Sequence, residues 1–459
     1  MKTCTPEQAQ RLSQAIRFRT VSLVTDDPAA ESRYTEFRGF EDFLRREFPR
    51  AAAALIWEKL GPLALLATWE PLKTAPALPG FLFYAHYDVV PPGDESSWTH
   101  PGFSGDCADG FIWGRGTLDD KGTLVGLMEA VEGLLAEGFT PSRPVYLAFG
   151  GDEETSGEKG ALVLAGTLAS RGVHLSCVFD EGSVISDGSL SFVPRPVALI
   201  GLAEKGIINA DLVVRGAPGH AAMPGRGTGP GALAAICTAI ERHPFPARLT
   251  PTVVRFFKSI APHTPGPLGL VLRFPRLMWP LLKIVAASTP SMDAMFRTTQ
   301  AITMVRAGEV PNVIPEEARA IINMRLLPGD SPEFALARIE SVARRHLPRP
   351  FSLEVRLLPG ANASGAIAES PMEPRIWKAL TEAIRETAPT SVIAPFLVLM
   401  YTDSRQFASI SDSIVRLMPV LLTVADIARI HGVDERISLE NYGGMIQYYA
   451  HVMRHGAGS

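Results

Sequence analysis

The sequence predicts an α/β protein in which a doubly wound mixed sheet forms the main domain and an α+β sandwich is inserted into it. Two observations predict this fold. Continuous apolar runs flank a helical pattern in the first 200 residues, and strands of period two alternate with helices further on. A chain of 459 residues also exceeds the size at which one hydrophobic core usually stops growing. We expect the main domain at 1–202 and 359–459, and the inserted domain at 203–358.

The first predicted element is a helix near the N-terminus. Thr5 is a suitable N-cap, Pro6 fits the first helical position, and Gln8 completes a capping box. No apolar segment of the signal-peptide type accompanies it. The four cysteines form no C-x-x-C pair, which indicates free thiols in a reducing compartment. We therefore expect a cytoplasmic protein.

Three apolar runs in the first block, 81–85, 144–149 and 177–179, have the composition of buried parallel strands. Between the first two, apolar residues recur at helical spacing over 124–135 until Gly138. This strand–helix–strand order is typical of a doubly wound unit. Ligands bind such sheets at the carboxyl ends of the strands.

The second block alternates strands and helices. Strands are predicted at 207–214, 318–326 and 351–357, and helices at 231–242 and 332–346. The first pattern then resumes. It predicts a helix at 373–387, an apolar strand at 393–400 and a closing helix at 442–454.

The stretch 267–287 is rich in apolar residues. Arg273, Arg276 and Lys283 interrupt it, and prolines break a continuous helix, so we expect no transmembrane segment. A buried or partner-facing helical pair is one interpretation. A surface for lipid or acyl chains is the other. The net charge of -4 gives no reason to expect a nucleic-acid partner.

Side chains of the kind that bind divalent metals follow several predicted strands. They are His86 in Y-A-H-Y-D, Asp119 in G-R-G-T-L-D-D-K-G, Glu153 and Glu154 in G-G-D-E-E-T-S-G, Asp180 in V-F-D-E-G and His431 in R-I-H-G-V-D-E-R-I. Two imidazoles with several carboxylates suit two borderline cations such as zinc. Taken singly, Asp119 could be a helix cap and the glutamates an acidic surface turn.

A leftover carboxylate beside bound metals could act as a base. Asp88 lies on the same face of its extended segment as His86, and can accept a hydrogen bond from the second imidazole nitrogen. Of Glu153 and Glu154, one would bind metal and the other would take a proton from a water molecule.

The order of these motifs, with G-H-x-x-x-P in the inserted block and a late H-G, resembles the co-catalytic di-zinc carboxypeptidase and aminoacylase family. The motifs T-D-S-R and H-G-V-D-E-R-I-S resemble most the branch of carboxypeptidase S and the N-fatty-acyl-amino-acid hydrolases. The resemblance covers essentially the whole chain. It implies a zinc-peptidase-like catalytic domain, with the inserted domain as a lid of the dimerisation type.

The resemblance also implies roles for individual residues. One metal would bind His86, Asp119 and Asp180, and the other would bind Asp119, Glu154 and His431. The general base would be Glu153, with Asp88 orienting His86. The peptide between Asp119 and Asp120 would be cis.

Three residues of the inserted domain match family positions. His220 would polarise the substrate carbonyl, Arg325 would bind a substrate carboxylate, and Asn312 would contact substrate. The chain has G-H-A-A where the family commonly has G-H-S-S, which bears on fine substrate contacts.

These inferences predict a metal-dependent hydrolase that uses two divalent cations, Zn²⁺ before Co²⁺ or Mn²⁺. It would cleave the amide bond of a C-terminal peptide or an N-acyl amino acid with a free carboxylate. Dipeptidase or N-deacetylase specificity is the alternative among enzymes, and a non-catalytic binding protein is the alternative from another class. A homodimer through the lid is the expected assembly.

Overall fold

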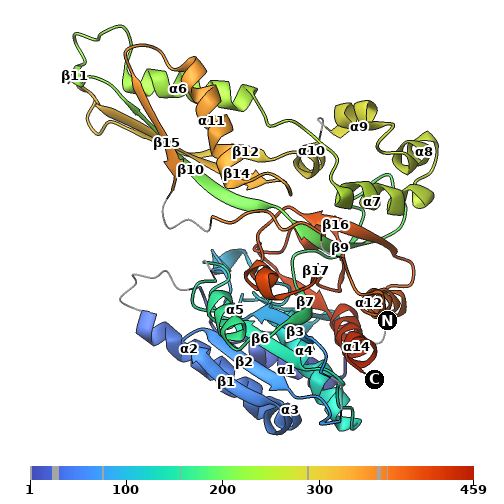
Figure 1. Cartoon of the computed structure of the whole chain (residues 1–459). Helices are drawn as coiled ribbons and strands as arrows, with labels where there is room; N and C mark the ends of the chain where they lie inside the picture. The colour runs from blue at the N-terminus through green and yellow to red at the C-terminus, as the bar shows by residue number, and fades with distance from the viewer. Residues whose placement is uncertain are drawn as a thin grey trace.

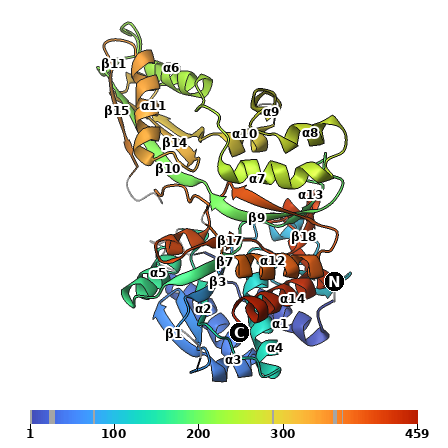
Figure 2. The same cartoon turned by 45° about the vertical axis from the view of Figure 1, so that its right-hand side comes forward.

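The structure, a computed structural model, describes residues 3–22, 30–74, 77–155, 157–286, 289–358, 363–369 and 371–458. Figure 1 shows two lobes: a large one that contains both ends of the chain, and a second one beside it made from the middle of the sequence. The turned view in Figure 2 shows the same division.

A large mixed sheet organises the first lobe. Its strands within the described residues are β1 (Ile56–Gly61), β2 (Ala64–Trp69), β3 (Gly80–His86), β6 (Val145–Gly150), β7 (Leu175–Asp180), β8 (Ile185–Asp187), β9 (Val197–Glu204), β16 (Val392–Val398), β17 (Ile414–Arg416) and β18 (Leu421–Thr423). Strand β3 is central and runs parallel to both β6 and β7. Strand β2 is antiparallel to β6. The predicted mixed, doubly wound sheet is confirmed.

Helices cover both faces of this sheet. The helices that pack on one face are α1 (Pro6–Ile16), α2 (Ala30–Glu47), α3 (Pro49–Ala54), α4 (Lys121–Ala136), α12 (Pro374–Thr387) and α14 (Leu439–Gly456). The other face carries α5 (Ala161–Ser170) and the 3₁₀ segment Asp403–Ile410. Strand β3 is buried along its whole length, which explains its continuous apolar sequence.

Smaller elements flank this core. They are the sheet β4 (Cys107–Ala108), β5 (Phe111–Trp113) and β19 (Arg436–Ser438), helix α13 (Val424–Ile427), and 3₁₀ turns at Glu95–Ser97 and Ala261–His263. The predicted capping box of Thr5 and Gln8 is present at α1. The four cysteines are free. Within the described ranges no helix is long and apolar enough to cross a bilayer.

The second lobe contains an antiparallel sheet in the order β12-β14-β10-β15. The elements of this lobe are β10 (Gly206–Arg215), β12 (Thr299–Ala307), β14 (Glu317–Leu326), β15 (Ser352–Leu357), α6 (Gly229–Arg242) and α11 (Pro332–His346), with the short pair β11 (Gly219–His220) and β13 (Val313–Ile314) at its tip. Both helices pack on one face of the sheet. The predicted strands and helices are present, and β12 and the short strands β11 and β13 were missed. The exact domain bounds 1–202, 203–358 and 359–459 stay a prediction.

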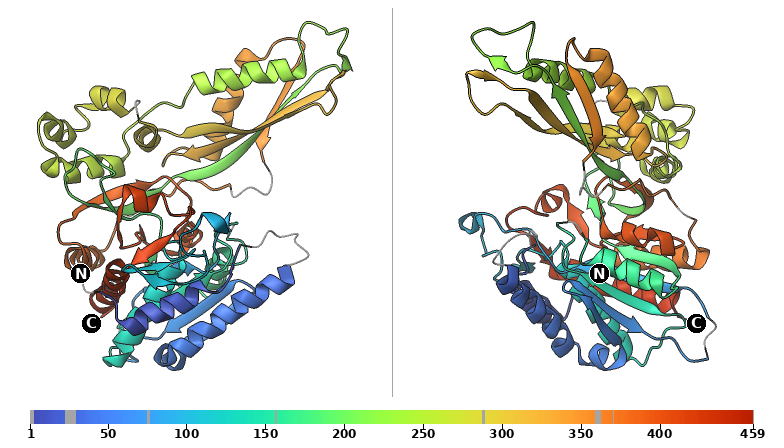
Figure 3. Two further views of the ribbon diagram at one scale, coloured as in Figure 1. Left: turned by 180° about the vertical axis from the view of Figure 1, so that it is seen from behind. Right: turned by 60° about the vertical axis from the view of Figure 1, so that its left-hand side comes forward.

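The segment between α6 and β12 packs differently from the rest of the inserted block. It folds into α7 (Pro251–Ile260), α8 (Pro267–Arg273), α9 (Trp279–Ala286) and α10 (Pro290–Phe296). Their apolar side chains share a core with β9 and β16 of the large sheet. Figure 3 shows these helices at the junction of the lobes, beside the antiparallel sheet rather than on it.

Candidate active site

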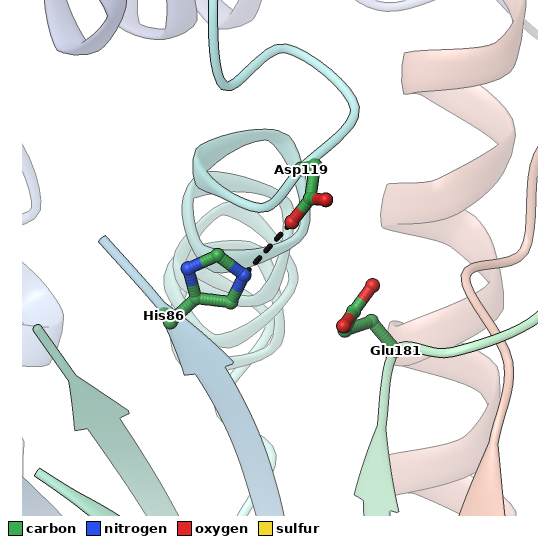
Figure 4. Close-up of side chains that lie close together, drawn as sticks. All are labelled: His86, Asp119 and Glu181. Carbon is green, nitrogen blue, oxygen red and sulfur yellow. Dashed lines mark hydrogen bonds and ion pairs between the residues drawn. The ribbon is translucent and has the colours of Figure 1, made fainter. Parts of the chain in front are cut away.

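His86 and Asp119 meet at the carboxyl end of the large sheet. His86 is the last residue of β3, and Asp119 lies in the loop that leads into α4. Nε2 of His86 is 2.8 Å from Oδ1 of Asp119 (Figure 4). Burial lowers the pKa of His86, but its hydrogen bonds with Asp119 and Asp88 outweigh this and raise it well above its usual value.

His431 contacts the other oxygen of Asp119. Its Nε2 lies 2.9 Å from Oδ2 of Asp119 and 3.1 Å from Oε1 of Glu154. Hydrogen bonds with these two carboxylates raise the pKa of His431 to about 10. Burial raises the pKa of Asp119, but the two histidines outweigh it and hold the pKa below its usual range. Asp119 thus stands between two imidazoles, as the predicted bridging ligand would.

Asp88 holds several parts of the site together. Nδ1 of His86 lies 3.1 Å from the backbone oxygen of Asp88 and 3.3 Å from its Oδ1. The backbone amides of Glu153 and Glu154 donate to its two carboxylate oxygens, each at 3.1 Å. The predicted orienting contact with His86 is therefore present, and Asp88 also fixes the turn that carries the two glutamates.

The loop before α4 has an unexpected arrangement of acids. The peptide between Asp119 and Asp120 is cis, as the family resemblance implied. Asp120 occupies the N-cap position of α4 without a side-chain capping bond. Its Oδ2 instead accepts a hydrogen bond from the backbone amide of His86 at 3.3 Å. Helix capping therefore does not account for either aspartate.

Glu435 links the Asp119 loop to the His431 loop, a contact that the motif analysis missed. Its Oε1 accepts hydrogen bonds from the backbone amides of Gly116, Leu118 and Asp119, at 3.0, 2.8 and 3.2 Å. Its Oε2 pairs with the buried Arg115, whose Nη2 donates to the backbone oxygen of His431 at 3.1 Å. In the sequence, Arg115 is the arginine of G-R-G and Glu435 is the glutamate of D-E-R, and these two residues were the available signals of this contact.

The structure does not place Asp180 in the predicted cluster. Its neighbour Glu181 offers the ligand atom that gathers with those of His86 and Asp119 (Figure 4). Asp180 ends β7, and its oxygens accept the backbone amides of Glu181 and Ser404, both at 2.9 Å. Successive residues leave a strand in opposite directions, so only one of the two acids faces the site. The adjacent acids of D-E-G could not be separated by sequence.

These donors fit two divalent cations. Two groups of three, His86–Asp119–Glu181 and Asp119–Glu154–His431, each keep their ligand atoms within 4.8 Å of one another. Each group combines one imidazole with two carboxylates, and the groups share Asp119. This donor chemistry suits Zn²⁺ and related borderline metals.

A cavity of about 690 Å³ opens beside this cluster. Asp119, Glu153, Glu154, Glu181 and His431 lie on its polar side. Its apolar wall consists of Val184, Leu199, Phe396, Met400, Met418, Ile427 and Ile430. No described residue of this segment, 267–286, lines the cavity, so the interpretation of the segment as an acyl-chain surface beside the site is not supported.

Arg325 lines the same cavity, although it comes from β14 of the second lobe. Its Nη1 is buried and has no hydrogen-bond partner in the described part of the chain. Burial lowers the pKa of Arg325 from its usual value. A buried guanidinium nitrogen without a partner is costly unless a ligand satisfies it.

The structure does not bring His220 or Asn312 to the cluster. His220 is exposed on β11, where its Nδ1 accepts the amide of Ala222, and the backbone oxygen of Asn312 accepts the amide of Ala221. Figure 1 shows β11 at the tip of the second lobe, remote from β3 and β7. Within one chain, these two predicted site residues lie together but outside the cavity.

Comparisons with known proteins identify the family and the fold of this chain. The family described as "Peptidase family M20/M25/M40" matches residues 82–455. "Probable carboxypeptidase S-like 2" of Dictyostelium discoideum is 32% identical over 98% of this chain and 85% of its own length. "N-fatty-acyl-amino acid synthase/hydrolase PM20D1" of Xenopus tropicalis is 34% identical over 97% and 85%.

A solved structure has the same fold. The M20 family metallo-carboxypeptidase Sso-CP2 from Sulfolobus solfataricus superposes with a TM-score of 0.71 at 17% identity, over 98% of this chain and 99% of that chain. The family match covers most of the sequence, including every predicted metal ligand. This chain therefore belongs to peptidase family M20/M25/M40 and is a metal-dependent amidohydrolase.

Proposed function

We propose that the protein hydrolyses the amide bond of a substrate that carries a free carboxylate on one side and a large apolar group on the other. N-acyl amino acids and C-terminal peptide bonds both meet this description. The observation that carries the proposal is one cavity lined by the metal-type cluster, by Arg325 and by an apolar wall.

Two kinds of side chain in the cavity lining suit the two parts of such a substrate. Arg325 has a buried nitrogen free to donate, and a planar guanidinium suits a carboxylate. The apolar wall would accept an acyl chain or a bulky side chain, at roughly 0.8 kcal/mol per buried methylene. Specificity for an acetyl group or a small dipeptide would leave much of this wall uncovered. The geometry therefore favours a larger apolar group.

In this proposal His86, Asp119 and Glu181 hold one cation, and Asp119, Glu154 and His431 hold the other, with Zn²⁺ the expected metal. Bound cations would supply Lewis acidity and ease deprotonation of water. Glu153 lies on the cavity wall and takes no part in either group of ligand atoms.

Glu153 would accept a proton from the attacking water and then donate it to the leaving amine. Burial raises the pKa of Glu153 well above its usual value, which suits a group that both accepts and returns a proton. Asp88 would keep the Glu153 backbone in place during both steps.

His220 and Asn312 would serve the active site of a second subunit. The support is that both residues are exposed at the tip of the second lobe, where Ala221 donates its backbone amide to Asn312, away from their own cavity. In a homodimer joined through the second lobe, this tip could reach the partner's cluster and donate a hydrogen bond to the developing oxyanion.

A substrate panel tests the proposal. Wild-type enzyme and Arg325→Met would be assayed on N-acyl amino acids of increasing chain length and on matched N-acyl amines without the carboxylate. Removing a charged hydrogen bond costs about 1.5–3 kcal/mol, so kcat/KM on the acids should fall roughly 10- to 150-fold. Turnover of the amines should already be poor and should not fall further.

A kcat/KM that does not rise with acyl length would remove the role of the apolar wall. An Arg325→Met enzyme that still prefers acids over amines would remove the carboxylate role of Arg325.

A further inference from the structure

The segment from α8 to α9 exposes several large apolar side chains to solvent. Leu270, Phe274, Leu277, Leu281 and Ile284 are spaced by three or four residues and are 66, 51, 78, 45 and 72% exposed. Folded proteins rarely leave several large apolar side chains of one short segment exposed without a use for them. The segment is therefore a candidate contact surface.

Other apolar side chains of the same segment are buried. Leu272 and Leu282 are 1 and 3% exposed, and they pack in the core that α7 shares with β9 and β16. In Figures 1 and 3, α7 lies between the large sheet and the α8–α9 pair, which forms the outer edge of the molecule. The exposed side chains are therefore not an incompletely packed core.

Basic residues surround these apolar side chains. Lys258, Arg273 and Arg276 line a shallow groove together with Phe274 and Leu277, and Lys283 follows on α9. All four basic residues are exposed, and none has an ion-pair partner among the described residues. Long basic side chains can cover apolar surface while their charged ends reach outward.

The charge of this region differs from that of the whole protein. Residues 242–292 contain seven Lys and Arg and no Asp or Glu, whereas the full chain has a net charge of -4. In a two-fold symmetric dimer through this face, the same basic surface of a second copy would oppose it. An anionic lipid surface offers both an apolar interior and negative headgroups.

We propose that the α8–α9 edge docks the protein peripherally on membranes that contain anionic lipid. Leu270, Phe274, Leu277, Leu281 and Ile284 would enter the headgroup boundary, and Arg273, Arg276, Lys258 and Lys283 would contact lipid phosphates. None of these residues lines the active-site cavity. Docking would therefore leave the cavity accessible, and the proposal does not depend on which substrate the enzyme cleaves.

Vesicle co-sedimentation tests the proposal. The wild-type protein would be mixed with vesicles of phosphatidylcholine and phosphatidylglycerol at 7:3, and separately with pure phosphatidylcholine vesicles. Each basic residue near an anionic surface contributes about 1 kcal/mol, so removing two should weaken binding about 30-fold. Arg273→Glu/Arg276→Glu should show at least this loss, and Leu277→Ser/Ile284→Ser should also bind more weakly.

The matched control is Arg344→Glu/Arg345→Glu, an equal charge change on two exposed residues of α11. It should retain wild-type binding, and circular dichroism should show that every variant is folded. The proposal is overturned if wild-type protein binds both vesicle types equally or neither. It is also overturned if the α11 control loses as much binding as the α8–α9 variant. Analytical ultracentrifugation would show whether the protein dimerises. A dimer that Leu277→Ser/Ile284→Ser abolishes, in a protein that binds no vesicles, would identify a second copy as the occupant instead.

Discussion

Replacing Glu435 with glutamine should weaken metal binding although Glu435 lies in neither group of candidate ligands. One of its carboxylate oxygens accepts three backbone amides around Asp119, and the other pairs with Arg115, which in turn holds the His431 backbone. A glutamine keeps a single acceptor oxygen. Either the amides or the guanidinium must then face an NH₂ group.

The expected magnitude follows from these contacts. Breaking a buried ion pair by removing one charge costs about 3–5 kcal/mol of stability. Partners that orient metal ligands typically change metal affinity by about 10- to 100-fold. Glu435→Gln should therefore lower both quantities. Urea unfolding of the chelated protein would measure stability, and competition with a chromogenic chelator would measure metal affinity.

Glu129→Gln provides a matched control. Glu129 is a buried glutamate of α4 that makes two hydrogen bonds of 2.6 Å with Arg11, remote from the cluster. This variant should lose stability but keep metal affinity within about twofold. If Glu435→Gln binds metal as tightly as Glu129→Gln does, Glu435 has only a structural role and the reasoning is refuted.

Five further outcomes are expected. Chelation should abolish activity and Zn²⁺ should restore it. The neighbouring carboxylates raise the pKa of His431 to about 10, and this residue must lose its proton to bind metal. Metal affinity should therefore rise about tenfold per pH unit between pH 6 and 8 for each proton displaced. Calorimetry in two buffers would detect the released protons, and a metal affinity that does not change with pH would contradict this expectation. Glu153→Gln should lose at least about 100-fold in kcat while elemental analysis still finds two metals, and near-normal turnover would exclude it as the base. Glu181→Ala should lose one metal and Asp180→Ala should keep both, with the reverse result restoring the original prediction. His220→Ala should depress kcat about 10²–10³-fold, and mixing it with Glu153→Gln subunits should restore activity if the residue acts across a dimer; normal kcat in the single variant would refute its role.

The sequence predicted the central fold because local signals and burial agree there. The continuous apolar run before His86 became the central parallel strand, and the helical spacing after Lys121 became α4. Strand β12 was missed because the segment before it folds into four short helices, whose packing on β16 has no local signal. The apolar composition of that segment indicated that it contacts something, but it could not distinguish contact with the protein core from contact with an outside partner.

Most of the candidate site was also predictable, since His86 ends β3 and Glu154 follows β6, and the other ligands lie in distinctive motifs. His86, Asp119, Glu154 and His431 converge as expected. The choice between Asp180 and Glu181 depends on how the chain leaves β7, and one-residue shifts of this kind are beyond pattern analysis. The sequence contains both Arg115 and Glu435 in the quoted motifs, but the contact between the two loops that Glu435 makes could not be inferred from those motifs alone.

Strands β9 and β10 form almost one strand, interrupted only by Lys205, and they join the two sheets. Arg325 pairs with Ile207 at the root of β10, whereas β11 with His220 lies beyond its far end. Ten extended residues span about 33 Å, so Arg325 lies close to Lys205 and His220 lies far from it. A small rotation of the second lobe about Lys205 would leave Arg325 nearly stationary and sweep His220 through a wide arc. If Arg325 binds the substrate carboxylate and His220 serves a second subunit, as proposed, such a rotation would keep the first contact in place while it moved the second residue.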